Sequence, residues 1–188
     1  MIDLYFEAAE EIGISSPPPL FFAKLKKGTL ARANKTFVGS GFNERTLSYE
    51  ILIDKEQMSS YEGPIPIKYI IAHEFAHIVT YSVLDGGGLT NDGEKHGASF
   101  LACWLHMLRC MKVSDDIIKK LAMWHAKEYQ LSEEQLMTAI KSAYSNNKSV
   151  EAARAAVTMP PTPLWHNLLL LLFGGGFMGY VSWAICYL

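Results

Sequence analysis

The chain has 188 residues, a formal net charge of -2 at pH 7 and 49% hydrophobic residues. This length is enough for one domain with a hydrophobic core plus an appendage. The small net charge argues against bulk electrostatic attraction to nucleic acid, but not against a local basic patch. Cys103, Cys110 and Cys186 are odd in number and form no C-x-x-C pair, which excludes a disulfide framework and indicates a reducing compartment.

The first third of the chain predicts one helix followed by strands. Residues 3–12 have the spacing of a short amphipathic helix, which Gly13 and the proline run 17–19 end. Between residues 20 and 58, period-two alternation predicts two or three antiparallel strands with glycine turns at Gly28 and at 39–41. The last of them, TLSYEILID (residues 46–54), has one apolar face. As an edge strand beside a cleft it could pair with an extended peptide.

Five basic residues lie within this strand region, in twelve positions that contain no acid: Lys24, Lys26, Lys27, Arg32 and Lys35. Lysine is common on exposed strands, so a solvated hairpin face explains the pattern. The functional alternative is a phosphate-contacting patch for DNA or RNA. Few aromatic residues that could stack on bases are nearby, which favours the solvated face.

The stretch Ile67–Ser82 carries the motif HEFAH, with His73, Glu74 and His77. Two histidines four apart on a helix lie about 40° apart in projection and roughly 6 Å apart along the axis, so both imidazoles can reach one metal ion. Glu74 projects beside them as a candidate general base. This is the H-E-x-x-H arrangement of zinc hydrolases. The opposite side of the helix is apolar, which predicts burial against the domain.

A catalytic zinc site needs a third protein ligand, and the sequence leaves its identity open. No histidine follows His77 at the spacing of an H-E-x-x-H-x-x-G-x-x-H site. The candidates further along the chain are Glu94, His96, Asp85, Asp92 and His106. His96 stands at the start of a helix behind the glycine-rich loop 85–95, from where a side chain can reach back. His106 lies among apolar residues in mid-helix and fits a core histidine.

The second half of the chain predicts further helices. One begins near His96 with apolar residues at core spacing up to Met111. Ser114 is the expected cap of a helix over 115–129, and Ser132 with Gln135 forms a capping-box pattern for a helix over about 133–144. A short helix over 150–157 would follow. The fold class predicted is therefore α+β, with a small sheet packed on the metal helix.

The C-terminal residues predict a membrane anchor. Residues 159–166 contain a proline-rich linker, and Asn167–Leu188 contains no charged residue. As a helix this segment would span about 33 Å, close to the apolar thickness of a bilayer. A buried helix of a soluble domain is the alternative. The N-terminus lacks the features of a signal peptide, so we expect a cytoplasmic catalytic domain held on a membrane by its C-terminal tail.

The HEFAH motif followed by His96-Gly97-Ala98-Ser99-Phe100 resembles the SprT-like zinc metalloprotease pattern, HExxH then H-G-x-x-F. The resemblance covers roughly residues 1–112, with a helical extension over 113–158. It implies a zincin domain in which His73, His77 and His96 bind one Zn²⁺ and Glu74 is the base. Members of this family include proteases that digest proteins crosslinked to DNA. The C-terminal zinc ribbon of many members is absent here. A weaker resemblance runs to IrrE-like metalloproteases, in which a glutamate, here Glu94, would be the third ligand.

The function predicted is zinc-dependent endopeptidase activity on protein substrates. Two alternatives stay open: a zinc protease of another family that cuts near the bilayer, and a membrane-tethered, non-hydrolytic adaptor that uses the zincin fold as a scaffold. An intact Glu74 argues against the adaptor, because a scaffold has no need for a general base. Tyr69, Tyr81 and His106 are candidate donors to the oxyanion, and the sequence does not choose among them.

Overall fold

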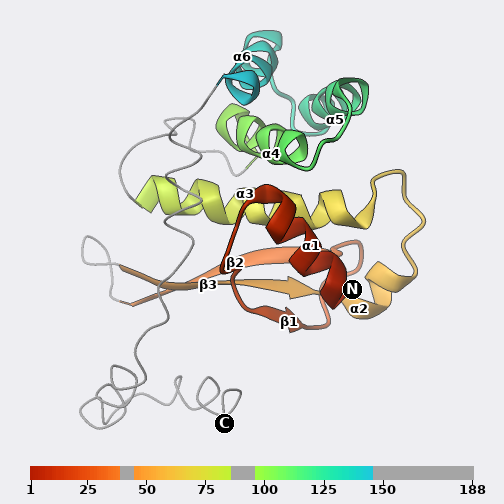
Figure 1. Ribbon diagram of the computed structural model, residues 1–188, viewed down its shortest axis with the longest axis vertical. Helices are drawn as coiled ribbons and strands as arrows, with labels where there is room; N and C mark the ends of the chain where they lie inside the picture. Colours follow the sequence, from red (N-terminus) through yellow and green to blue (C-terminus); the bar gives the residue numbers. More distant parts are fainter. Residues whose placement is uncertain (39–44, 86–95, 146–188) are drawn as a thin grey trace, which may run out of the picture. The chain divides into compact units, whose positions relative to one another are not determined.

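The computed structural model describes residues 1–38, 45–85 and 96–145, with backbone only at 36–38, 45–47 and 81–85. In this part the chain is a mixed α+β protein (Figure 1). Its elements follow in the order α1 (Ile2–Ile12), β1 (Leu20–Phe22), β2 (Ala31–Val38), β3 (Arg45–Ile53), α2 (Lys55–Ser59), α3 (Ile67–Asp85), α4 (Ala98–Cys110), α5 (Asp115–Glu128) and α6 (Glu133–Tyr144). The predicted fold class is thus confirmed at the level of α+β.

The three strands form one sheet in the order β1-β3-β2. β2 and β3 are antiparallel, with Ala33 opposite Ile51, as the sequence predicts. The prediction of a wholly antiparallel sheet is wrong, because β1 runs parallel to β3, with Leu20 opposite Ile51. A period-two pattern fixes which face of a strand is buried, but not which strands become neighbours. The predicted turn at Gly28 is present, with a positive φ of 87° that suits glycine.

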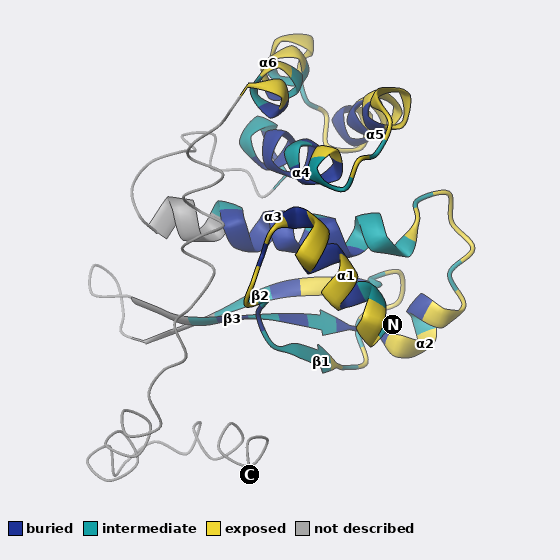
Figure 2. Cartoon of the chain, viewed as in Figure 1, coloured by how far each residue is buried: buried dark blue, intermediate teal, exposed yellow. Residues whose placement is uncertain are grey.

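α3 is the central helix of the described chain. It crosses one face of the sheet, and α4, α5 and α6 lie on its other side (Figure 1). Its predicted apolar side is buried at Ile71, Phe75 and Ile78, each with no exposed surface. They belong to the same core cluster as the sheet residues Ile51 and Ile53. Figure 2 shows the middle turns of α3 as buried. The metal motif is therefore on a helix that packing holds from several sides.

The helices after α3 begin near the positions that the sequence predicts. Ser114 stands at the N-cap of α5, as expected, but its side chain makes no capping hydrogen bond. α4 buries Phe100, Trp104 and Leu105, three of the predicted core residues. The predicted capping box is present at α6, where the Ser132 hydroxyl accepts a hydrogen bond from the Gln135 backbone N–H and the Gln135 side chain accepts one from the Ser132 N–H. α4 packs against both α5 and α6. These two helices thus pack on the same unit that contains the metal motif.

Helix α2 is an element that the sequence reasoning missed. Asp54 caps it, and Gln57 on its first turn contacts the loop between β1 and β2. The Gln57 amide Nε2 donates to the carbonyl of Lys26, and its Oε1 accepts from the Gly28 N–H. The signal was the Asp-x-x-Gln pattern directly after a strand, which resembles a capping box. This contact fixes the loop that carries part of the basic patch.

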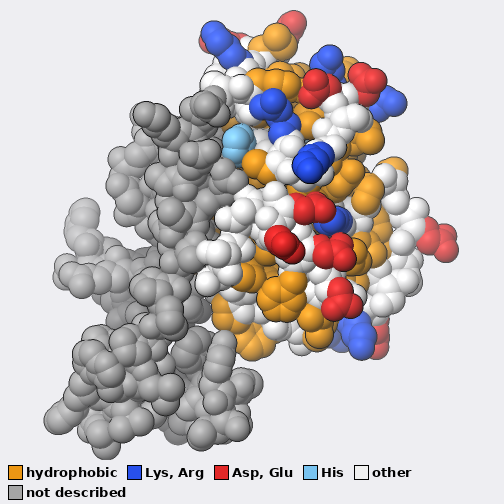
Figure 3. Space-filling model, viewed as in Figure 1, with side chains coloured by type: hydrophobic (Ala, Val, Ile, Leu, Met, Phe, Trp, Pro, Cys, Tyr) orange, Lys and Arg blue, Asp and Glu red, His pale blue; other side chains and the backbone are white. Residues whose placement is uncertain are grey.

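Acidic side chains gather over α1 on the face shown in Figure 3. Glu7 and Glu11 of this helix form ion pairs with Lys68 of α3, at 3.4 and 2.7 Å. These pairs are at the surface, so each contributes little to stability, about 0–1 kcal/mol. They nevertheless connect α1 to the first turn of α3.

The predicted helix over 150–157, the linker 159–166 and the anchor Asn167–Leu188 lie outside the described residues. Among the helices that the structure describes, none is both long and apolar enough to cross a membrane. The membrane anchor therefore stays a prediction.

The cap at Asp54 predicts a pH dependence of stability. Its carboxylate accepts hydrogen bonds from the N–H groups of Gln57 and Leu25 and from the Gln57 side chain, which together lower the pKa of Asp54 from 3.8 to about 2. Because the pKa is lower in the folded state, this stabilisation is complete above pH 4 and is lost as the pH falls towards 2. We expect Asp54→Asn to flatten the fall in unfolding free energy between pH 4 and 2, measured by urea denaturation. The exposed neighbour Glu56→Gln is the control, and equal slopes in Asp54→Asn and the parent would contradict the assignment.

Candidate metal centre

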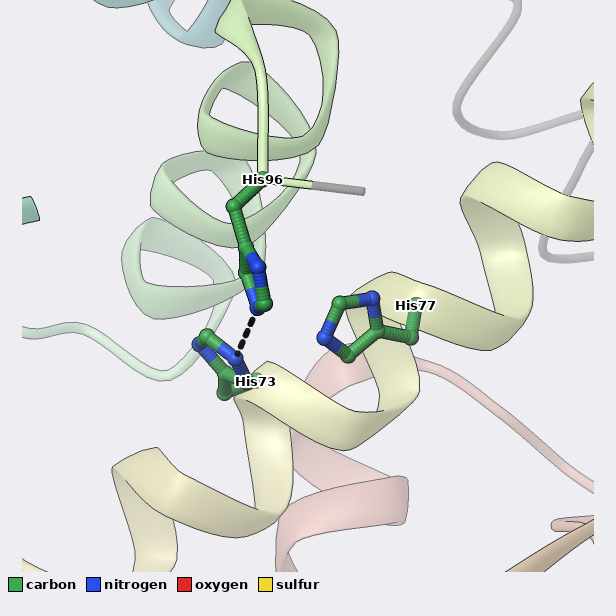
Figure 4. A group of neighbouring side chains, drawn as sticks. All are labelled: His73, His77 and His96. Atoms are coloured by element: carbon green, nitrogen blue, oxygen red, sulfur yellow. Dashed lines mark hydrogen bonds between the residues drawn. The ribbon is translucent and has the colours of Figure 1, made fainter. Parts of the chain in front are cut away.

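Three histidine side chains converge between α3 and the start of α4 (Figure 4). His73 and His77 lie one turn apart on α3, with ring centroids 4.9 Å apart. His96 lies two residues before α4, and its ring is 5.2 Å from that of His73 and 4.7 Å from that of His77. One ring nitrogen from each histidine lies within 4.8 Å of the others. The arrangement could hold one metal ion.

The spacing of these rings and the low pKa of His73 fit a metal. The Nε2 atoms of His73 and His96 are 3.3 Å apart. A tetrahedral ion with metal–nitrogen bonds of about 2.0–2.1 Å places its ligand atoms about 3.4 Å apart. Burial, together with the neighbouring His77, His96 and His125, holds the pKa of His73 well below its usual range. Its imidazole is therefore neutral at pH 7, which is the form that binds a metal.

Phe100 packs against all three rings. Its centroid lies 4.7 Å from His73, 4.3 Å from His77 and 5.0 Å from His96, and its side chain is 1% exposed. Trp104, one turn further along α4, lies edge-on to His73 at 5.1 Å, and its indole N–H donates to the Tyr69 carbonyl at 3.2 Å. These aromatic side chains restrict the rotamers of the histidines. Less side-chain conformational entropy is therefore lost when an ion binds.

Helix α5 contributes two residues that the sequence reasoning missed. His125 is fully buried, and its Nε2 lies 2.9 Å from the backbone carbonyl of His96, to which the ring donates as the Nε2–H tautomer. Tyr129 stacks on the His96 ring, with centroids 4.1 Å apart and 17° between the planes. The sequence could have indicated that His125 is buried, because it continues the apolar face of α5 formed by Ile118, Leu121 and Ala122. Tyr129 follows one turn later.

Glu74 is buried beside the histidines and tied to the sheet. Its Oε2 accepts a hydrogen bond from the Ala33 N–H of β2 at 2.7 Å, and the residue is only 7% exposed. Burial raises the pKa of Glu74 from 4.5 to about 7, and the Ala33 hydrogen bond opposes this shift. A carboxyl with a pKa near neutrality can both accept and release a proton, as a general base requires.

The structure separates His106 from the other candidate ligands. Its Nδ1 lies 3.5 Å from the Ala143 carbonyl, at the contact between α4 and α6. The expectation that His106 is a packing residue agrees with this position. Glu94 and Asp92 lie outside the described residues, as does the side chain of Asp85. His96 is thus the candidate third ligand that the described structure brings to the pair on α3.

The strand that offers an edge at this site is β2, not β3. The suggestion that residues 46–54 form the edge strand is wrong, because β3 pairs with β1 on one side and β2 on the other. The Ile51 N–H donates to the Pro19 carbonyl on the β1 side, so Ala33 opposite it directs its own N–H away from β3. This Ala33 N–H donates its hydrogen bond to the Glu74 carboxylate. The β2 edge therefore borders the candidate base.

No family model, curated protein or solved structure matches this chain. Function is therefore inferred from the three-histidine arrangement and its surroundings.

The convergent rings predict one metal ion per chain. We expect purified protein incubated with Zn²⁺ and dialysed to retain one equivalent, measured by atomic emission spectroscopy. His77→Ala and His96→Ala should each lose most of it, because two imidazoles bind zinc far more weakly than three. His106→Gln, on α4 but away from the cluster, should keep full occupancy. Full zinc in His96→Ala would assign the third ligand elsewhere.

Proposed function

We propose that this protein is a zinc-dependent endopeptidase of the SprT-like, zincin type. The observation that carries the proposal is the convergence of His73, His77 and His96 beside the buried Glu74. Three imidazoles with a neighbouring carboxylate that is not a ligand are typical of hydrolytic rather than structural zinc sites. The HExxH and H-G-x-x-F patterns support the same class.

When bound, zinc supplies a Lewis acid that lowers the pKa of water towards about 7 and polarises the scissile carbonyl. Glu74 would take the proton of the attacking water. Its Oε2 is engaged with the Ala33 N–H, so Oε1 is the oxygen that accepts the proton. The same carboxyl would then protonate the leaving amine as the C–N bond breaks. A pKa near 7 suits both transfers.

The β2 edge supports an extended peptide as the substrate. Ala33 directs its backbone away from β3 and lies next to Glu74. The Ala33 N–H is already bonded to Glu74, so a peptide that paired with this edge would use neighbouring residues of β2 and would pass beside the base. The sequence of the substrate is not defined by backbone pairing, because such contacts are common to all peptides.

The role of Glu74 is tested by Glu74→Gln. We expect this variant to bind zinc as the parent does and to lose casein cleavage by at least about 10²-fold, because an amide cannot accept the proton. A chelator should abolish the activity of the parent, and added zinc should restore it. Glu56→Gln, an exposed substitution on α2, should cleave at the parental rate.

The same comparison separates the enzyme from a non-hydrolytic adaptor. An adaptor would bind zinc yet show no cleavage that depends on zinc or on Glu74. Cleavage that survives in Glu74→Gln at the parental rate would contradict Glu74 as the base.

DNA-associated protein is a second candidate substrate class. Lys24, Lys26, Lys27 and Arg32 are exposed, and the Gln57 contacts hold the loop that precedes β2. A fixed basic loop could contact phosphates without sequence readout.

If this patch binds DNA, single- or double-stranded DNA should accelerate cleavage of a DNA-bound protein at low salt, and less so as salt rises. The triple variant Lys24→Gln, Lys26→Gln, Lys27→Gln should lose the acceleration and keep the DNA-independent rate. Equal rates with and without DNA in the parent would favour a general or membrane-proximal protease.

We further propose that the catalytic part acts in the cytoplasm and that residues 167–188 tether it to a membrane. The support is the absence of charged residues from this segment, together with its length. Partition of the full chain between membrane and soluble fractions, compared with a chain ending at residue 158, tests the tether.

A further inference from the structure

Tyr129 lies beside the three-histidine cluster but is not one of the candidate metal ligands. It follows the last residue of α5, and its backbone N–H donates to the His125 carbonyl at 2.9 Å, which fixes the residue at the helix end. Its ring is held on two sides, by His96 at 4.1 Å and by His125 at 4.5 Å. Contacts with His96 and His125 therefore fix the position of the Tyr129 ring.

The other end of Tyr129 is at the surface. The residue is 36% exposed, whereas His125 beneath it has no exposed surface. Part of the Tyr129 side chain is therefore exposed, and the Glu74 carboxylate is among the charges that act on its phenol. A tyrosine with a packed ring can offer its hydroxyl to a ligand. Burial, followed by the charges of Glu128 and Glu74, raises the pKa of the Tyr129 phenol above its usual range. The hydroxyl therefore keeps its proton and is a hydrogen-bond donor.

We propose that Tyr129 donates a hydrogen bond to the oxyanion that forms on the scissile carbonyl, and this inference rests on the proposed peptidase function. As water adds to the carbonyl carbon, the C–O bond forms, the π pair moves to the carbonyl oxygen and Glu74 takes the water proton. The Tyr129 hydroxyl stabilises this negative oxygen and keeps its own proton. When the C–N bond breaks, Glu74 gives the water proton to the leaving nitrogen, the carbonyl re-forms and the hydrogen bond to Tyr129 weakens.

The structure favours Tyr129 over the candidates that the sequence offered. His106 lies at the α4–α6 contact, near the Ala143 carbonyl. Tyr69 is two residues after Ile67, at the start of α3, and its carbonyl accepts the Trp104 indole N–H. The side chain of Tyr81 is outside the described residues. Tyr129 is the tyrosine whose ring touches a candidate ligand in the part of the chain that is described.

The test is Tyr129→Phe, which keeps the stacked ring and removes only the hydroxyl. We expect unchanged zinc content and thermal stability, a nearly unchanged KM, and a fall in kcat of about 10²–10³-fold, the range for loss of one oxyanion donor. A phosphinic peptide, whose tetrahedral anion resembles the oxyanion, should bind at least about 10-fold more weakly by calorimetry. Tyr61→Phe, between α2 and α3, is the matched control and should match the parent in each measurement.

Each outcome decides the inference. Parental kcat and parental affinity for the phosphinic peptide in Tyr129→Phe would overturn it while leaving the peptidase function intact. The same losses in Tyr69→Phe and not in Tyr129→Phe would assign the donor to Tyr69. Lost zinc in Tyr129→Phe would show that the hydroxyl supports the metal centre instead. No cleavage by the zinc-loaded parent would remove the proposed function and, with it, this role of Tyr129.

Discussion

The packing of α4 against α3 is the constraint on which the candidate metal centre depends. His73 and His77 are placed by one helix, but a third imidazole must come from elsewhere in the chain. Phe100 lies against all three rings and is itself almost fully buried. A shift of α4 relative to α3 would move Phe100 and His96 together, because they are only four residues apart.

A second layer of contacts fixes His96 from the side of α5. His125 is buried and donates to the His96 carbonyl, and Tyr129 stacks on the His96 ring. This layer matters because His96 lies outside α4, two residues before the helix begins. Loss of the contacts that orient a metal-binding histidine typically lowers metal affinity by about 10–100-fold.

The sheet contributes to the site through one backbone group. The Ala33 N–H reaches the Glu74 carboxylate at 2.7 Å, while burial of Glu74 raises its pKa to about 7. The two effects oppose each other, so the carboxyl is neither locked in its charged form nor kept neutral. The sheet edge thus contacts the candidate base through a backbone hydrogen bond as well as packing against α3.

The sequence by itself determined the elements whose signals are local. The HEFAH spacing placed two histidines and Glu74 on a helix, and Ser132 with Gln135 marked the start of α6, because a helix repeats every 3.6 residues and caps act over three residues. Only the tertiary structure decided the rest: that β3 lies between β1 and β2, that His96 and not His106 joins the pair, and that His125 and Tyr129 surround His96. Those relations join residues far apart in the chain, and burial patterns specify which faces are covered without specifying by what.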